Sequence, residues 1–114
     1  LLLGNWLTQP KGIVRPETEQ HAIDARTRNL ALYHFPTCPF CLKSRRVMKR
    51  LSLNIELRDA RNNATHRAAL VAGGGKPQVP CLLITDDDGK QTWLYESDAI
   101  NAYFNHEFGD AAAA

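Results

Sequence analysis

The chain has 114 residues, enough for one domain with a modest core, and its 44% hydrophobic and 23% charged residues are typical of a soluble globular protein. A net charge of +2 is too small to predict a nucleic-acid partner. Three cysteines are too few for a disulfide scaffold, and their odd number favours a reducing, cytoplasmic compartment.

The first 28 residues are predicted to be a leader or linker. The sequence starts without Met, and Leu1 to Leu7 followed by Lys11 and Arg15 has the pattern of a membrane segment entering its cytoplasmic flank. Seven residues are too few to span a bilayer, which needs about 20. Two interpretations stay open, namely the stub of a membrane anchor at the cytoplasmic face and an apolar tail that packs on itself. Three residues indicate an extended linker after it: Pro10, Gly12 and Pro16.

The rest of the chain alternates between strand and helix patterns. Apolar or alternating stretches predict strands at 30–35, 54–59, 76–85 and 91–95. Helices are predicted over 17–28, 42–51, 62–72 and 97–104, the third of them ended by the glycines at 73–75 and the last capped by Ser97 or Asp98.

Between the last two strands, Asp88-Gly89 predicts a hairpin turn. Residues 109–114 are a low-complexity tail, so the folded domain is expected over residues 29–108. After the leader, the order β-α-β-α-β-β-α predicts an α/β domain. Its mixed four-stranded sheet should carry helices on both faces.

A C-x-x-C motif, Cys38-Pro39-Phe40-Cys41, stands where the first strand gives way to a helix. Pro39 suits the first helical turn, which leaves Cys38 at the helix start, where free N–H groups and the helix dipole favour a thiolate. The thiolate is the nucleophile in disulfide exchange. The following helix is basic and should lower the pKa of Cys38 further; its cations are Lys43, Arg45, Arg46, Lys49 and Arg50.

A reactive dithiol is the favoured interpretation of this pair, and two alternatives stay open. The pair could be half of a zinc or iron–sulfur site, or two inert thiols. Zinc would need a second pair of ligands, and the four histidines of the chain show no paired spacing, so no metal is expected. Cys81 begins an apolar run and is predicted to be a buried strand residue, with a third redox thiol as the alternative.

Three motifs in this order resemble the glutaredoxin family of the thioredoxin fold: Cys38-Pro39-Phe40-Cys41, Val79-Pro80 and the start of the last helix. The stretch Tyr95 to Ile100, with its Glu-Ser-Asp-Ala-Ile sequence, is also similar to the amino-terminal domain of glutathione transferases. The resemblance covers about residues 29–108. It implies that Cys38 is the nucleophile, that Cys41 is the resolving thiol, and that Val79-Pro80 is a cis peptide facing them. An ordinary edge-strand proline is the alternative for Pro80.

The sequence departs from the family at two positions. Glutaredoxins often carry a lysine three residues before the first cysteine, where this chain has Phe35. Their usual diglycine-then-acid signature before the last helix is replaced by the stretch Tyr95 to Asp98. One basic contact for glutathione is therefore missing, which leaves Lys76 or Lys43 to replace it.

The expected glutathione site combines the resemblance with the chemistry of a helix start. Free N–H groups and Ser97 suit the γ-glutamyl carboxylate, while Asp98 and Glu96 suit its ammonium group. Val79 would pair with the cysteinyl part through its backbone, and Lys76 with the glycyl carboxylate. The resemblance adds Phe40 and Pro80 beside the thiols. The alternative is that Glu96, Ser97 and Asp98 only cap the helix.

The sequence thus predicts a glutathione-dependent thiol–disulfide oxidoreductase. Glutathione would be its cosubstrate, and disulfide-containing or glutathionylated proteins would be its partners. The competing hypothesis is a non-catalytic module that binds glutathione or shares an iron–sulfur cluster between two copies through Cys38.

Overall fold

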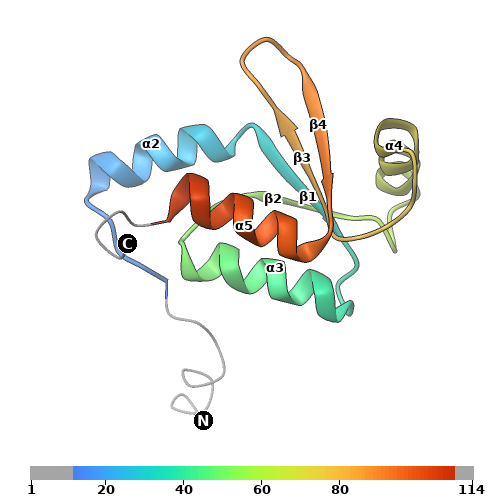
Figure 1. Cartoon of the computed structure of the whole chain (residues 1–114), viewed down its shortest axis with the longest axis horizontal. Helices are drawn as coiled ribbons and strands as arrows, with labels where there is room; N and C mark the ends of the chain where they lie inside the picture. Colours follow the sequence, from blue (N-terminus) through green and yellow to red (C-terminus); the bar gives the residue numbers. More distant parts are fainter. Residues whose placement is uncertain (1–11, 110–114) are drawn as a thin grey trace.

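A four-stranded sheet forms the centre of residues 12–109, the part of the chain that the computed structural model describes (Figure 1). The strands are β1 (Leu30–His34), β2 (Glu56–Asp59), β3 (Cys81–Thr85) and β4 (Gln91–Tyr95), in the spatial order β2-β1-β3-β4. β1 and β2 run parallel, whereas β3 is antiparallel to both β1 and β4. The predicted mixed sheet is confirmed, and β1 is buried along its whole length.

Four helices connect and flank these strands: α2 (Glu17–Thr27), α3 (Pro39–Arg50), α4 (Ala64–Gly74) and α5 (Ser97–Phe108). α3 begins at Pro39, which takes the first-turn position predicted for it, because proline fits the first helical position. The side chain of Asn63 accepts a hydrogen bond from the His66 N–H and caps α4. Gly75, in the left-handed region at φ 92°, ends that helix within the predicted glycine run.

The helices cover both faces of the sheet, as predicted, and each face has its own buried cluster. On one face, Leu30 and Leu32 of β1 pack with residues of α3 and α5, including Met48 and Phe104. On the other face, residues of β1 and β3 pack with Leu70 of α4. β1 supplies both clusters because successive side chains of a strand point to opposite faces. Burying both faces fixes the position of the β1 end, where the C-x-x-C motif follows.

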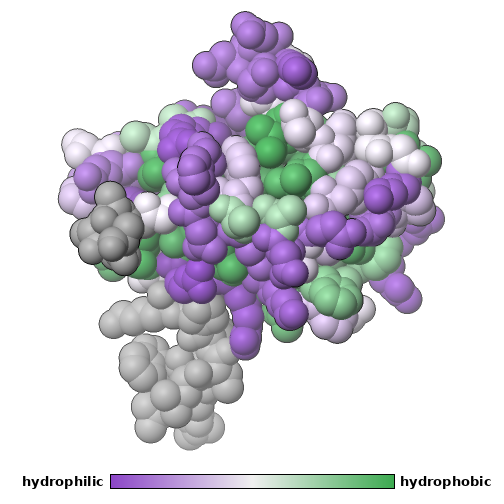
Figure 2. All heavy atoms as spheres, viewed as in Figure 1, coloured by the Kyte–Doolittle hydropathy of each residue, from purple (hydrophilic) through white to green (hydrophobic). Residues whose placement is uncertain are grey.

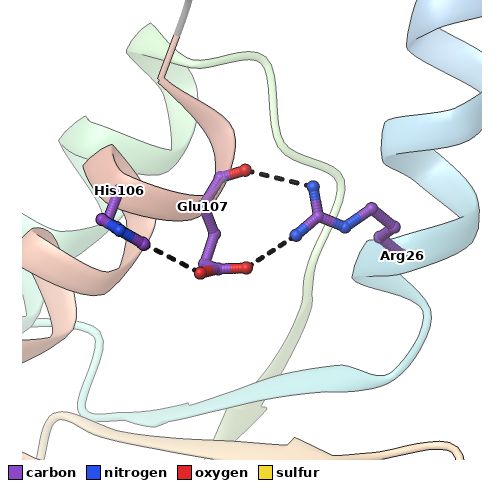
Figure 3. Close-up of polar contacts among 3 residues, drawn as sticks. All are labelled: Arg26, His106 and Glu107. Atoms are coloured by element: carbon purple, nitrogen blue, oxygen red, sulfur yellow. Dashed lines mark hydrogen bonds and ion pairs between the residues drawn. The ribbon is translucent and has the colours of Figure 1, made fainter.

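Helix α2 lies beside the carboxyl end of α5 (Figure 1). Arg26 donates hydrogen bonds to the side chain (2.8 Å) and the carbonyl oxygen (3.1 Å) of Glu107, and His106 contacts the same carboxylate (Figure 3). The Arg26 guanidinium also lies 4.6 Å from the centre of the Phe108 ring. Ile23 packs against the core cluster beneath. The described part of the leader is therefore packed against the domain by both apolar and charged contacts.

The β3–β4 hairpin projects from the body of the molecule, and its tip is hydrophilic (Figures 1 and 2). The Asp86 carboxylate accepts hydrogen bonds from the N–H groups of Asp88 (3.0 Å) and Lys90 (2.8 Å). Gly89 adopts φ 83°, a conformation that costs glycine little. The Asp-Gly turn predicted from the sequence is confirmed.

Two predicted segments, the apolar stretch Leu1 to Leu7 and most of the tail at 109–114, lie outside the described residues. Within residues 12–109, none of the helices is long and apolar enough to cross a membrane.

Candidate functional site

The two cysteines of the C-x-x-C motif lie where β1 ends and α3 begins. Cys38 has an extended backbone (φ −77°, ψ 126°) and is the N-cap of α3, and Pro39 takes the first helical position. The Cys38 N–H donates to the Phe35 carbonyl (3.1 Å), and the Cys38 carbonyl accepts from the Leu42 N–H (2.9 Å). The turn is thus held on both sides of Cys38. Its thiol is partly exposed, whereas Cys41 is fully buried.

The surroundings of Cys38 favour its thiolate. Partial burial raises the pKa of the thiol, but hydrogen bonds from the Cys41 N–H, the Cys41 thiol and the Phe40 N–H lower it, as does the charge of Arg45. The net result is a pKa below the ordinary value. The N–H donors belong to the first turn of α3, where backbone donors have no partner within the helix. The predicted effect of the helix start on this pKa is confirmed.

Cys41 has the opposite character. Burial is the main cause that raises the pKa of its thiol to about 11, and the neighbouring Cys38 raises it further. The Phe35 N–H lies 3.5 Å from the Cys41 sulfur and donates to it. Near neutral pH Cys41 therefore keeps its proton and can donate it toward Cys38. The two thiols of one motif therefore differ in burial and in the direction of their pKa shifts.

The basic residues of α3 have the same predicted role in the sequence but different surroundings in the structure. Lys43, Arg46, Lys49 and Arg50 are exposed, and the Lys43 ammonium lies 5.5 Å from the centre of the Phe40 ring. Arg45 instead turns back toward the end of β1, where it contacts His34, Phe35 and Pro36. Neither Arg45 nor His34 was singled out for such a role. The spacing of four residues from Cys41 to Arg45, one helical turn, is the signal that could have found Arg45.

Val79-Pro80 forms the predicted cis peptide, immediately before β3. Because Tyr33 pairs with Cys81 in the antiparallel register, the two residues before Cys81 extend alongside the end of β1. Val79 is half-buried and Pro80 is buried at this end of the sheet, the same end as the C-x-x-C turn. The structure therefore places this bend at the dithiol end of the sheet.

Cys81 is buried in β3, as predicted, and belongs to the core cluster on the α4 face. Burial is the main cause that raises the pKa of this thiol to about 11. α3, which carries Cys41, packs on the opposite face. Cys81 is therefore separated from the C-x-x-C motif by the sheet itself.

The loop from Lys76 to Val79 is attached to β4 and to the start of α5. The Tyr95 hydroxyl donates to the Lys76 carbonyl (2.9 Å), and the Lys76 ammonium lies 4.6 Å from the centre of the Tyr95 ring. Gln78 donates to the Glu96 carboxylate (3.0 Å). These contacts bring three of the predicted glutathione-binding residues, Lys76, Val79 and Glu96, into one connected segment.

The start of α5 corrects one prediction. Ser97 or Asp98 was expected to be the N-cap, but Ser97 is already helical and Glu96 is the N-cap, with no capping hydrogen bond from its side chain. Glu96 adopts φ 78°, which is unusual for a residue with a Cβ, and its carboxylate is free to meet Gln78. Ser97 is buried and Asp98 is exposed in the first turn. Helix propensity alone could not locate this boundary, because glutamate is not a residue type that indicates a positive φ.

Two further observations complete the site. Phe40 is 57% exposed beside Cys38, so an apolar surface flanks the thiol. Among residues 12–109, no three His, Cys, Asp or Glu side chains are grouped so that they could hold a metal ion.

Comparison with known proteins gives one family match and several structural ones. Glutaredoxin 2 from Chlamydomonas reinhardtii has a TM-score of 0.52 at 21% identity, over 81% of this chain and 83% of that one. Glutathione transferase E6 from Drosophila melanogaster has a TM-score of 0.57 at 24% identity, over 74% of this chain and 37% of that one. Maleylacetoacetate isomerase from Anaeromyxobacter dehalogenans 2CP-1, solved with GSH bound in its active site, has a TM-score of 0.55 at 25% identity, over 73% and 39%.

The chain therefore spans less than two fifths of the length of the transferase and the isomerase, and these likenesses show the thioredoxin-like fold. A search of curated protein sequences finds no match. A family model described as Glutaredoxin matches residues 30–88, more than half of the chain, including the C-x-x-C turn and Val79-Pro80. The chain belongs to the glutaredoxin family.

Proposed function

We propose that the protein is a glutathione-dependent thiol–disulfide oxidoreductase in which Cys38 is the nucleophile and Cys41 the resolving thiol. The observation that carries this proposal is the contrast between the two thiols. Cys38 is partly exposed with a lowered pKa, and Cys41 is buried with a pKa of about 11. Membership of the glutaredoxin family supports a glutathione-linked thiol redox function.

In the first step the Cys38 thiolate attacks the glutathione sulfur of a mixed disulfide between glutathione and a protein. The disulfide bond of the substrate breaks, a bond between Cys38 and glutathione forms, and the protein thiolate leaves and takes up a proton from water. The N–H groups at the start of α3 stabilise the Cys38 thiolate before attack and again when it is regenerated.

In the second step a glutathione thiolate attacks the glutathione sulfur bound to Cys38. Oxidised glutathione is released and the Cys38 thiolate is restored, so the incoming glutathione sulfur is oxidised and the protein sulfur is reduced, while the glutathione of the mixed disulfide leaves as half of oxidised glutathione. A protein disulfide would instead leave its own sulfur on Cys38, and Cys41 would attack Cys38 to form an intramolecular disulfide. Two glutathione molecules would then reduce that disulfide.

Cys41 becomes easier to ionise once Cys38 is part of a mixed disulfide. Its raised pKa is due first to burial, but the hydrogen bond to Cys38 and the charge of the Cys38 thiolate also raise it. Both of these contributions disappear when Cys38 forms a disulfide, whereas burial stays. Formation of the mixed disulfide therefore removes the two smaller causes of the raised pKa of Cys41 and makes this thiol more reactive when it has a disulfide to resolve.

Glutathione itself is proposed to lie between the C-x-x-C turn and the start of α5. The exposed Asp98 and the carboxylate of Glu96 suit its ammonium group, and the N–H groups of the first turn suit its γ-glutamyl carboxylate. The half-buried Val79 would pair with its backbone, and the exposed Lys76 would meet its glycyl carboxylate. The exposed Phe40 ring would cover the thiol end.

The substrates would be glutathionylated or disulfide-bonded proteins of a reducing compartment, the cytoplasm. The test is a glutathione-coupled reduction assay on a glutathionylated peptide. Cys38→Ser should abolish turnover, Cys41→Ser should keep it, and Cys81→Ala serves as the control because Cys81 lies on the other face of the sheet. Turnover by Cys38→Ser at the wild-type rate would refute the proposal.

Absorption spectra of the same protein preparations distinguish the enzyme from the cluster-binding module. Protein purified without oxygen should lack visible absorption bands of an iron–sulfur cluster. Bands that vanish in Cys38→Ser, together with no measurable turnover, would favour the cluster-binding hypothesis.

A further inference from the structure

Arg45 extends from α3 back to the segment that leads into the C-x-x-C turn. One guanidinium nitrogen lies 2.9 Å from the His34 Nδ1 and 3.4 Å from the Phe35 carbonyl oxygen, and the other donates to the Pro36 carbonyl (2.9 Å). These partners are the last residue of β1 and the two residues after it. The side chain thus joins the second turn of α3 to the segment that leads into Cys38.

His34 is a buried hydrogen-bond partner of this guanidinium. The residue is 7% exposed, and burial, followed by the charge of Arg45, lowers the pKa of the ring, while Asp59 on β2 raises it. A neutral imidazole accepts at one nitrogen only, so the short contact with Arg45 places the lone pair on Nδ1 and the proton on Nε2. His34 therefore holds the guanidinium of Arg45 in place without adding a charge of its own.

The charged and titratable groups that act on the two thiols are few in the described part of the chain. Cys38 faces Cys41 and Arg45, and Cys41 faces Cys38 and Arg45. From the β2–α4 loop, the guanidinium of Arg61 lies 6.0 Å from the centre of the Phe35 ring, on the residue whose carbonyl Arg45 contacts. Position 35 itself carries no charge, so the cation nearest to the turn comes from the helix.

We propose that Arg45 is the positioning residue of this site: its guanidinium fixes the Phe35-Pro36 segment against α3 and presents a fixed positive charge to the Cys38 sulfur. This inference rests on the proposed function for its biological meaning, but it concerns the chemistry of Cys38 alone. Two effects are combined. The hydrogen bonds of the Arg45 guanidinium keep Cys38 aligned with the N–H donors of Phe40 and Cys41, and its positive charge favours the thiolate directly.

The test is the pH profile of iodoacetamide alkylation at Cys38, measured in the Cys41→Ser, Cys81→Ala background so that one thiol reports. Arg45→Met removes both the hydrogen bonds and the charge, so it should raise the pKa of Cys38 and slow alkylation at pH 6 several-fold. Arg45→Lys keeps the charge but has a single ammonium that cannot serve both His34 and Pro36, so it should recover only part of the loss. Arg45→Gln keeps donors without the charge and should also fall between wild type and Arg45→Met.

Lys43→Met is the matched control, because it removes an exposed cation from the same helix, closer in sequence to Cys38 but over the Phe40 ring and not on the Phe35-Pro36 segment. Its alkylation profile should move less than that of Arg45→Met. Melting curves establish which variants are folded. If Arg45→Met is unfolded, the alkylation profiles of Arg45→Lys and Arg45→Gln test the inference. A profile unchanged in the folded Arg45 variants, or moved as far by Lys43→Met, would overturn the inference.

Because alkylation needs no glutathione, this result is independent of the electron donor. A failed glutathione assay with a shifted profile in Arg45→Met would reject the proposed function and keep the role of Arg45. An active enzyme with an unshifted profile would do the reverse.

Discussion

At pH 7 the folded protein should react with iodoacetamide at Cys38 long before it reacts at Cys41 or Cys81. The pKa values of Cys41 and Cys81 are raised by burial to about 11, against an ordinary value of 9.0. Near neutral pH the thiolate fraction falls tenfold per unit, so ionisation alone makes these two thiols about a hundredfold less reactive than ordinary cysteines. Cys38, with its lowered pKa, should be more reactive than an ordinary cysteine at the same pH.

The assay is a time course of alkylation followed by peptide mapping, at a series of pH values between about 5 and 10. The Cys38 rate should rise with pH and level off first, because its thiolate is fully formed at lower pH. The rates at Cys41 and Cys81 should still be rising at the alkaline end. In concentrated guanidinium chloride all three should react alike. Labelling of Cys41 or Cys81 as fast as Cys38 in the folded protein at pH 7 would refute the reasoning.

Three further changes test other parts of the account. Asp98→Ala should weaken the use of glutathione about tenfold, or about 1.4 kcal/mol, the loss of one charge-assisted contact in a steady-state titration; unchanged kinetics would exclude this residue from the site. Gly73→Ala should destabilise the fold in urea titrations, since a Cβ there would overlap the Trp93 ring. Overpacking costs about 1–3 kcal/mol, at least as much as the ~1 kcal/mol that alanine gains in a helix, so a net gain in stability would contradict the packing of α4 on β4. Arg26→Met should lower the free energy of unfolding in urea titrations by at most about 1 kcal/mol, because the ion pair with Glu107 is half-exposed. A larger loss would show that the contact between α2 and α5 contributes more than an exposed ion pair.

The sequence alone predicted the sheet and the dithiol turn because both depend on local patterns. Apolar runs bounded by glycine and proline marked the strands, and Pro39 marked the start of α3 once it was read as a first helical residue. The glycines at 73–75 marked the end of α4. These signals act over a few residues, so no long-range information was needed.

Other features depend on contacts between distant segments, and the sequence pattern did not reveal them. The positive φ of Glu96 accompanies its contact with Gln78, 18 residues away in the chain. The role separating Arg45 from its four basic neighbours depends on the direction of its side chain toward the end of β1. The packing of α2 relies on Glu107, 81 residues after Arg26. In each case a local pattern allowed several outcomes, and the tertiary structure selected one.

The most direct test of the central claim is to trap the first intermediate on the enzyme. Cys41→Ser, incubated with a glutathionylated peptide and then acid-quenched, should carry one glutathione, and peptide mapping should place it on Cys38. The adduct should disappear on addition of reduced glutathione, with release of oxidised glutathione. An adduct on Cys81, or continued turnover with Cys38 unmodified, would contradict the assignment of Cys38 as the nucleophile that carries glutathione.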